Sequence, residues 1–216
     1  MINHDLLAFY QAQANILYHA LYFEPGDYLL DQLRDIEVWD SWPQSGEPEL
    51  RAQGLARLQE CLRQDNATLL TQLKPDFTQL FVGPQMPTAL PWGSPYLHEK
   101  RLLCGPSTEA LAAFMNHYGI SVKTDNKEPI DHIGLMLSMV GQLFGKEMQD
   151  KDGVHLGVAK ALLEQHLLPW SGRFETLMLE HADSGYYQGI ALLTASVLAG
   201  LKSDLELNPV SLSLYQ

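Results

Sequence analysis

A proline-rich apolar segment, residues 77–97, is the feature that most limits how this chain can fold. It reads FTQLFVGPQMPTALPWGSPYL, with prolines at 84, 87, 91 and 95 among large apolar and aromatic side chains. Proline lacks an N–H donor and disfavours helical geometry at the residue before it, so no continuous helix can cross this segment. We therefore predict a helix that ends near Phe81, followed by a long, stiff, apolar loop. Long ordered loops are more often functional than incidental, and an apolar one suits binding better than catalysis.

Elsewhere the apolar residues recur at helical spacing, and strand-like alternation is nearly absent. We predict an all-α fold, a single helical domain over residues 1–216 with about nine to ten helices. The expected helices cover residues 5–22, 27–38, 48–63, a stretch capped by Asp65 or Asn66, 76–81 beginning at Pro75, 106–118, 128–144, 154–167, 170–181 and 186–201. Residues 83–105 are a candidate hinge between N- and C-terminal halves, and the tail, 208–216, is expected to be loosely held.

The charge balance limits the classes of partner. The chain of 216 residues carries a formal net charge of −12, which disfavours non-specific binding to nucleic acid or anionic membranes and favours a cationic partner or none. The most apolar stretches, residues 133–145 and 189–201, are too short to span a bilayer. Only Cys61 and Cys104 are present, and no signal-peptide pattern opens the sequence. We therefore expect a cytoplasmic protein without a membrane span or bound nucleic acid.

Asp131-His132 is the most suggestive polar pair, because an aspartate can orient an imidazole for acid–base catalysis. Neighbouring helical residues point in different directions, however, and no nucleophile motif accompanies the pair. Two alternatives to a binding protein are therefore kept. One is a small cytoplasmic hydrolase that uses Asp131 and His132, and the other is a structural subunit of an enzyme complex.

Other motifs give weaker signals. No histidine or cysteine spacing matches a metal-site pattern, so we expect no metal site. The run GQLFGK at residues 141–146 is one residue short of a phosphate loop and lacks the following Ser or Thr. We expect no resident cofactor, with binding of a nucleotide left open. Residues 166–174 are expected to form a helix–helix corner in which Trp170 and Phe174 are buried one turn apart.

Three groups of residues, taken together, resemble the signatures of a known family. They are FTQLFVGP at 77–84 with PWGS at 91–94 and Tyr96, then EPIDHIG at 128–134, and finally HLLPW at 166–170 with Phe174. In order and separation they are similar to the signatures of the TorD/DmsD/NarJ family of redox-enzyme maturation chaperones, and their residues are most similar to those of the DmsD-like branch. This chain has Phe77 where the family usually has Trp or Tyr, which removes a polar tip.

The resemblance implies an all-helical cytoplasmic chaperone without enzymatic activity. Such chaperones bind the twin-arginine signal peptide of a molybdoenzyme precursor, of the DMSO or TMAO reductase type, and hold it until cofactor insertion, before export. Translocase components are further partners within this expectation, and binding of a molybdenum-cofactor precursor is left open. Under the same resemblance, the structural-subunit alternative becomes an accessory subunit of an oxidoreductase complex. Carried over by position, the peptide-binding residues are Phe77, Leu80, Phe81, Pro84, Pro91, Trp92, Gly93, Ser94, Tyr96, Glu128, Asp131 and His132.

The charge and loop chemistry agree with this implication. A twin-arginine peptide is cationic at one end and apolar behind it, so an acidic protein with an apolar loop is complementary to both parts. Asp131 is expected to attract the arginines, with help from Glu128. Protonation of His132 would oppose a cationic ligand, so binding is expected to tighten as the pH rises from about 5.5 to about 7.5.

Overall fold

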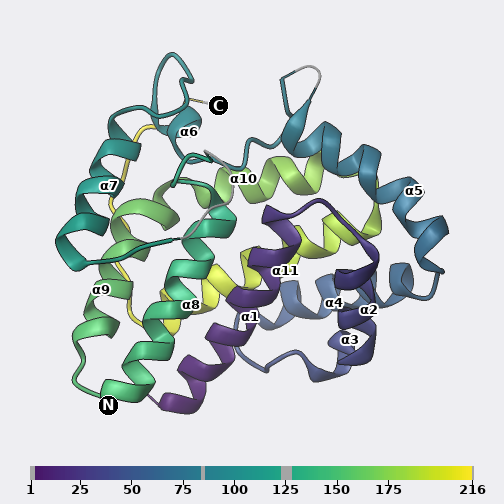
Figure 1. The fold of residues 1–216 in the computed structure, drawn as a ribbon, viewed down its shortest axis with the longest axis horizontal. Coiled ribbons are helices and arrows are strands. Elements are labelled where there is room, and N and C mark those ends of the chain that lie inside the picture. Colours follow the sequence, from purple (N-terminus) through teal and green to yellow (C-terminus); the bar gives the residue numbers. More distant parts are fainter. Residues whose placement is uncertain (1–2, 84–85, 123–127, 216) are drawn as a thin grey trace.

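A computed structural model describes residues 3–83, 86–122 and 128–215 (Figure 1). Helices are the only regular secondary-structure elements in this part of the chain, so the predicted all-α class is confirmed. The α-helices are α1 (His4–Tyr22), α2 (Asp27–Asp35), α3 (Val38–Ser41), α4 (Pro48–Leu62), α5 (Asn66–Phe77), α6 (Ser94–Leu97), α7 (Pro106–Tyr118), α8 (Ile133–Asp150), α9 (Val154–Leu162), α10 (Leu168–His181) and α11 (Gly185–Asp204). Two π-helical turns, η1 (Thr78–Val82) and η2 (Leu163–Leu167), follow α5 and α9.

Side-chain caps set where several helices begin. Asn3, Asp65 and Ser184 accept backbone N–H bonds at the starts of α1, α5 and α11. Glu47 does the same for α4, directly before Pro48. Each cap satisfies donors that the first helical turn leaves without a partner, and Pro at the first position needs none. The four starts therefore lie within one residue of their predicted positions.

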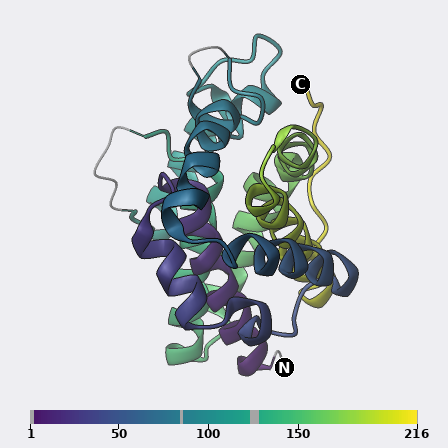
Figure 2. The same ribbon diagram turned by 90° about the vertical axis from the view of Figure 1, so that its right-hand side faces the viewer.

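The centre of the fold is built on α1 and α11. α1 packs along α8, while α11 packs along α4 and α10 and also contacts α1. Figure 2 shows α1 and α8 on one side of the molecule and α10 and α11 on the other. α4 and α11 approach closely at Gly54 and Gly189, where a Cβ on Gly189 would lie 2.9 Å from the Gly54 carbonyl oxygen.

Buried apolar residues from both sides of the proline-rich segment form one core cluster. Leu17 of α1, Val140 of α8 and Leu193 of α11 are each fully buried in it. The N- and C-terminal halves are thus joined by packing, while a hinge at residues 83–105 stays a prediction. Within the described residues, no helix combines the length and the apolar character needed to cross a membrane.

Two predicted boundaries shift by several residues. α2 ends at Asp35 rather than at residue 38, because Glu37 adopts a positive φ of 47° before the chain enters α3. α8 begins at Ile133 rather than at Glu128, because the residue before Ile133 is its N-cap. The short helix α6 lies within the segment that was predicted to be a loop.

Pro75 lies inside α5, so the predicted helix start at Pro75 is wrong. α5 continues into η1 because its buried side chains share one face, which includes Leu73, Asp76 and Leu80. The carboxylate of Asp76 accepts the N–H groups of Asp183 and Ser184 at 3.1 and 2.8 Å, beneath the start of α11. These long-range contacts outweigh the cost of an internal proline, which is about 3 kcal/mol.

The predicted helix end before Pro169 is also wrong. The chain changes direction between α9 and α10 (Figure 1), but it does so through η2 without leaving helical structure. In a π-helical turn an N–H bonds to the carbonyl five residues earlier, so a donor at position 169 would serve Glu164. That carbonyl instead accepts the N–H of Val210 at 3.0 Å.

Backbone N–H groups attach the C-terminal tail to other elements at three positions, so the expectation of a loosely held tail is wrong at these positions. Besides Val210, Asn208 donates its N–H to the Glu164 carboxylate at 2.7 Å. Near the end, Tyr215 donates its N–H to the Tyr96 carbonyl at 3.0 Å. Figure 1 shows the tail running from α11 towards α6.

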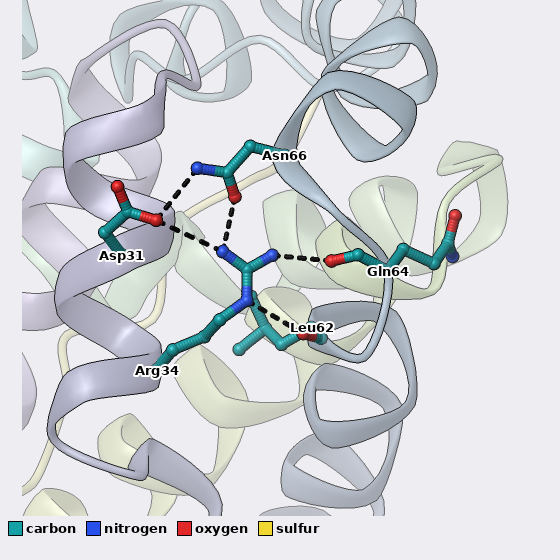
Figure 3. Close-up of polar contacts among 5 residues, drawn as sticks. All are labelled: Asp31, Arg34, Leu62, Gln64 and Asn66. Carbon is teal, nitrogen blue, oxygen red and sulfur yellow. Dashed lines mark hydrogen bonds and ion pairs between the residues drawn. The ribbon is translucent and has the colours of Figure 1, made fainter.

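A polar cluster around Arg34 fixes α2 against the junction of α4 and α5 (Figure 3). The guanidinium donates to the carbonyls of Leu62 and Gln64, both at 2.8 Å, and to the side chains of Asp31 and Asn66. The two carbonyls lie at the end of α4, where helical carbonyls lack intrahelical partners. A planar group with five donors suits this position better than an ammonium would.

Candidate functional site

A cavity of about 590 Å³ opens between the end of α1, the end of η1 and the proline-rich segment. We call it the aromatic cavity. Its apolar lining consists of Tyr18, Leu21, Tyr22, Phe23, Phe77, Phe81, Val82, Pro87, Leu90, Pro91, Trp92 and Leu103, and its polar lining of Glu24, Glu128 and His132. An apolar hollow of this size with a few polar groups is typical of a binding site.

Backbone bonds hold the proline-rich segment against the start of α8. The Pro91 carbonyl accepts the N–H of Ile133 at 2.8 Å, and the N–H of Gly93 donates to the Asp131 carbonyl at 3.1 Å. These bonds give backbone partners to a segment whose prolines prevent regular secondary structure. The segment therefore forms an ordered wall over its described residues.

The ring of His132 lies in this wall between two aromatic side chains. Its centroid is 5.1 Å from that of Tyr22 and 5.7 Å from that of Trp92, both in edge-to-face contact. Its Nδ1 accepts the N–H of Gly134 at 3.0 Å, which caps α8. In the neutral ring, Nε2 then carries the hydrogen.

Burial lowers the pKa of His132 to about 3. The ring is therefore neutral throughout the range from about pH 5.5 to about pH 7.5, where an unperturbed histidine would titrate. The expectation that protonation of His132 weakens ligand binding in this range is wrong, because the surrounding aromatic side chains exclude water from the ring.

Two carboxylates reach the aromatic cavity. Glu128 accepts the indole N–H of Trp92 at 2.9 Å, which positions it in the wall. Glu24, directly after α1, is exposed, and its nearest carboxylate oxygen lies 3.9 Å from Nζ of Lys74. Exposed pairs at this distance contribute little, so Lys74 does not prevent Glu24 from meeting another cation. The cavity thus combines aromatic walls with two negative charges.

Asp131 lies outside the aromatic cavity. Its Oδ2 accepts the N–H of Ser94 at 2.7 Å, and the side chain is buried. It lines a separate cavity of about 130 Å³ together with Gly93 and Trp170. The carboxylates that line the larger cavity are therefore Glu24 and Glu128, while the attraction of arginines by Asp131 stays a prediction.

The same geometry disfavours the hydrolase alternative. In catalytic triads an aspartate accepts the Nδ1–H of the histidine and so orients the ring. Here Nδ1 of His132 accepts a backbone N–H instead, and Asp131 bonds to the Ser94 backbone. Among the described residues, no group of three or more His, Cys, Asp or Glu side chains is placed to hold a metal ion.

The predicted site residues divide into three groups. Those that line the aromatic cavity are Phe77, Phe81, Pro91, Trp92, Glu128 and His132. Those that support the segment or belong to the core are Leu80, Gly93, Ser94, Tyr96 and Asp131. Pro84 lies outside the described residues.

Sequence reasoning missed the wall that α1 supplies. Tyr18, Tyr22 and Phe23 form a contacting cluster, with ring centroids 4.9 to 5.5 Å apart. The run YHALYFE at residues 18–24 did carry a signal, because three aromatic residues and a carboxylate gather at a helix end. Helical periodicity assigned part of that run to the core, which accounts for Leu21 but not for the exposed Phe23.

Comparison with known proteins identifies the family. A profile of the nitrate reductase delta subunit family matches residues 46–176, which is more than half of the chain. The chain belongs to this family. The resemblance to the TorD/DmsD/NarJ chaperones is thereby confirmed.

Relatives named as chaperones match this chain over most of its length. The probable Tat proofreading chaperone DmsD of Haemophilus influenzae is 29% identical and covers 90% of this chain and 91% of that protein. The Tat proofreading chaperone DmsD of Salmonella paratyphi A is 30% identical, covering 89% and 88%. The chaperone protein TorD of Aliivibrio fischeri is 28% identical, covering 62% and 63%.

The three signature segments of this chain, at residues 77–96, 128–134 and 166–174, pack on one another. Tyr96 stacks on Trp170 with ring centroids 5.4 Å apart, and its hydroxyl donates to the Leu90 carbonyl at 2.9 Å. A Cβ on Gly93 would lie 2.6 Å from Nε1 of Trp170, so only glycine fits there. Gly93 also donates its N–H to the Asp131 carbonyl. The signature at residues 166–174 therefore supports the one at 77–96, which in turn holds the one at 128–134.

Proposed function

We propose that this protein binds the twin-arginine signal peptide of a molybdenum-cofactor reductase precursor, of the DMSO or TMAO reductase type. It holds the precursor in the cytoplasm until the cofactor has been inserted, before export. The observation that carries the proposal is the aromatic cavity with the carboxylates of Glu24 and Glu128. Relatives named Tat proofreading chaperones support it. The proposed activity is binding without catalysis and requires no resident cofactor.

The aromatic cavity complements both parts of such a peptide. An arginine side chain can place two parallel N–H groups on the carboxylate of Glu128 and lie over the ring of Trp92. The methylene groups of the arginines and any apolar residue directly beside them can bury area against Phe77 and Phe81. The net charge of −12 favours the approach of a cationic leader.

Calorimetric titration with two synthetic leaders tests the proposal. One leader carries paired arginines before its apolar stretch, and the other carries paired glutamines. We expect micromolar affinity for the arginine leader, about −8 kcal/mol, with a negative heat-capacity change from apolar burial. The glutamine leader should bind more weakly. Equal affinity for the two leaders would contradict the proposal.

A pair of variants locates the arginine contact. Glu128→Gln should reduce the preference for arginine over glutamine, because the carboxylate loses its charge while Trp92 keeps a side-chain acceptor. Glu60→Gln, on the exposed face of α4, removes the same charge from a residue that does not line the cavity and should leave the preference unchanged. An equal effect of both variants would mean that net charge, and not the cavity, selects the leader.

A further inference from the structure

A second hollow adjoins the aromatic cavity, between α1 and α2. We call it the α1–α2 groove. It measures about 500 Å³ and shares Phe23 and Glu24 with the aromatic cavity. Its other walls include Ile16 and His19 from α1 and Leu29 from α2. The two hollows therefore meet at the corner where α1 gives way to α2.

The groove presents large apolar side chains to solvent. Phe23, Tyr28 and Ile36 all line it, and their exposed fractions are 43%, 78% and 45%. Single exposed apolar residues are ordinary, but several around one hollow mark a surface that binds something. Glu24 is the only acidic side chain among the described lining residues, and none of these residues is Lys or Arg. The chemistry of the groove favours an uncharged apolar ligand.

The outer wall of the groove is held in place before any ligand binds. Arg34 of α2 donates to the carbonyls of Leu62 and Gln64 at the end of α4 (Figure 3). On the inner side, Leu30 and Leu33 of α2 are buried in the core. A groove with fixed walls avoids part of the ordering cost of binding.

We propose that the α1–α2 groove binds the uncharged apolar stretch of the leader peptide, beside arginines held in the aromatic cavity. This inference rests on the proposed function. The order of the surfaces matches the order of the peptide, because Glu128 lies in the first hollow, Glu24 lies where the two hollows meet, and apolar side chains lie beyond Phe23 in the second. An apolar helix laid into a groove between two helices is an established mode of peptide recognition.

Photo-crosslinking locates the apolar stretch directly. A twin-arginine leader with benzoylphenylalanine in the middle of its apolar stretch is irradiated with the full-length protein, and the adducts are mapped by mass spectrometry. We expect adducts within residues 28–36, a range that includes groove-lining residues of α2 and its C-cap Ile36 and contributes no residue to the aromatic cavity. Adducts confined to residues 77–92 or 128–132 would place the apolar stretch in the aromatic cavity and overturn the inference.

Substitution in the groove gives a second test. Ile36→Glu places a charge at a half-exposed position and should weaken binding of the arginine leader about tenfold, whereas Ile36→Leu should not. Tyr28→Asp changes a side chain that is already mostly exposed, so it tests the groove with little effect on folding. Unchanged affinity in both charged variants would overturn the inference.

The outcomes separate the inference from the proposed function. Absence of binding of any arginine leader to the wild-type protein rejects the function itself. Binding that depends on the paired arginines and on Glu128, but not on Ile36 or Tyr28, leaves the function standing and rejects the groove as the apolar subsite.

Discussion

Acid should destabilise this protein through His132, because its ring is buried in the neutral form. Burial lowers the pKa of His132 to about 3, against 6.5 for the unperturbed side chain. Between these two values the unfolded chain binds a proton that the folded chain does not. The free energy of unfolding therefore falls as the pH falls below about 6.5.

The size of the effect follows from the gap between the two pKa values. Each pH unit below the unfolded pKa lowers the free energy of unfolding by about 1.4 kcal/mol. At about pH 5 the loss from this one residue reaches about 2 kcal/mol, and at about pH 7.5 it vanishes. A typical domain has only about 5 to 15 kcal/mol of stability, so the loss is easily measured.

Urea unfolding at about pH 7.5 and about pH 5, followed by circular dichroism, isolates the contribution when wild type is compared with His132→Asn. Asparagine is a favoured N-cap and does not titrate, so the variant keeps an acceptor for Gly134. His19 and His166, whose pKa values burial also lowers, are present in both proteins and cancel. We expect wild type to lose about 2 kcal/mol more than the variant. Equal losses, with the His132 ring seen by NMR to titrate near pH 6.5, would refute the reasoning.

Four further outcomes are expected. Arg34→Ala should lower the free energy of unfolding by about 2 kcal/mol in urea titrations, and Arg34→Lys by less, because the bonds to Leu62 and Gln64 are lost wholly or in part; equal losses would show that fork geometry is irrelevant. Trp92→Ala should weaken leader binding by about 2 kcal/mol or more with little change in Tm; a collapsed Tm with normal binding would make Trp92 a core residue only. Asp131→Asn can still accept the Ser94 N–H, so the preference for paired arginines should persist in calorimetry; its loss would return the arginine contact to Asp131. Burial raises the pKa of Glu175 to about 7, so wild-type stability should fall by about 1 kcal/mol as the pH rises from about 6 to about 9, while Glu175→Gln shows no such fall; parallel pH profiles would contradict this.

The starts of α1, α4, α5 and α11 were predictable from the sequence because their causes are local. Glu47 with Pro48, and Asp65 with its own first turn, act within three residues. The errors at Pro75 and Pro169 have distant causes. The Asp76 carboxylate accepts the N–H of Ser184, which is more than a hundred residues away in the sequence. The Glu164 carbonyl, to which Pro169 cannot donate, accepts the N–H of Val210 in the C-terminal tail. A propensity rule that considers neighbours alone cannot anticipate such partners.

The site was partly predictable for the same reason. The prolines and aromatic side chains in residues 77–97 predicted a wall of a binding groove, and residues of this segment do line the aromatic cavity. The roles of Asp131 and Glu128 were not separable, since both are acidic and they are three residues apart. The bonds of Pro91 and Gly93 to the start of α8 decide which carboxylate meets the larger cavity, and these bonds join residues about forty positions apart.

In the proposed complex, the carboxylates contribute selectivity for arginine, and the apolar surfaces contribute most of the affinity for the leader. Glu24 is exposed and Glu128 is half-buried, so in the proposed complex we expect each to attract an arginine through partly screened electrostatics worth about 1 kcal/mol or less. Apolar burial contributes about 25 cal/mol for each Å² removed from water, so we expect the aromatic cavity and the α1–α2 groove to supply most of the binding free energy. A leader without arginines then binds less tightly rather than not at all. Discrimination by a modest electrostatic difference, on top of reversible apolar binding, suits the proposed function, which requires both retention and release of a precursor.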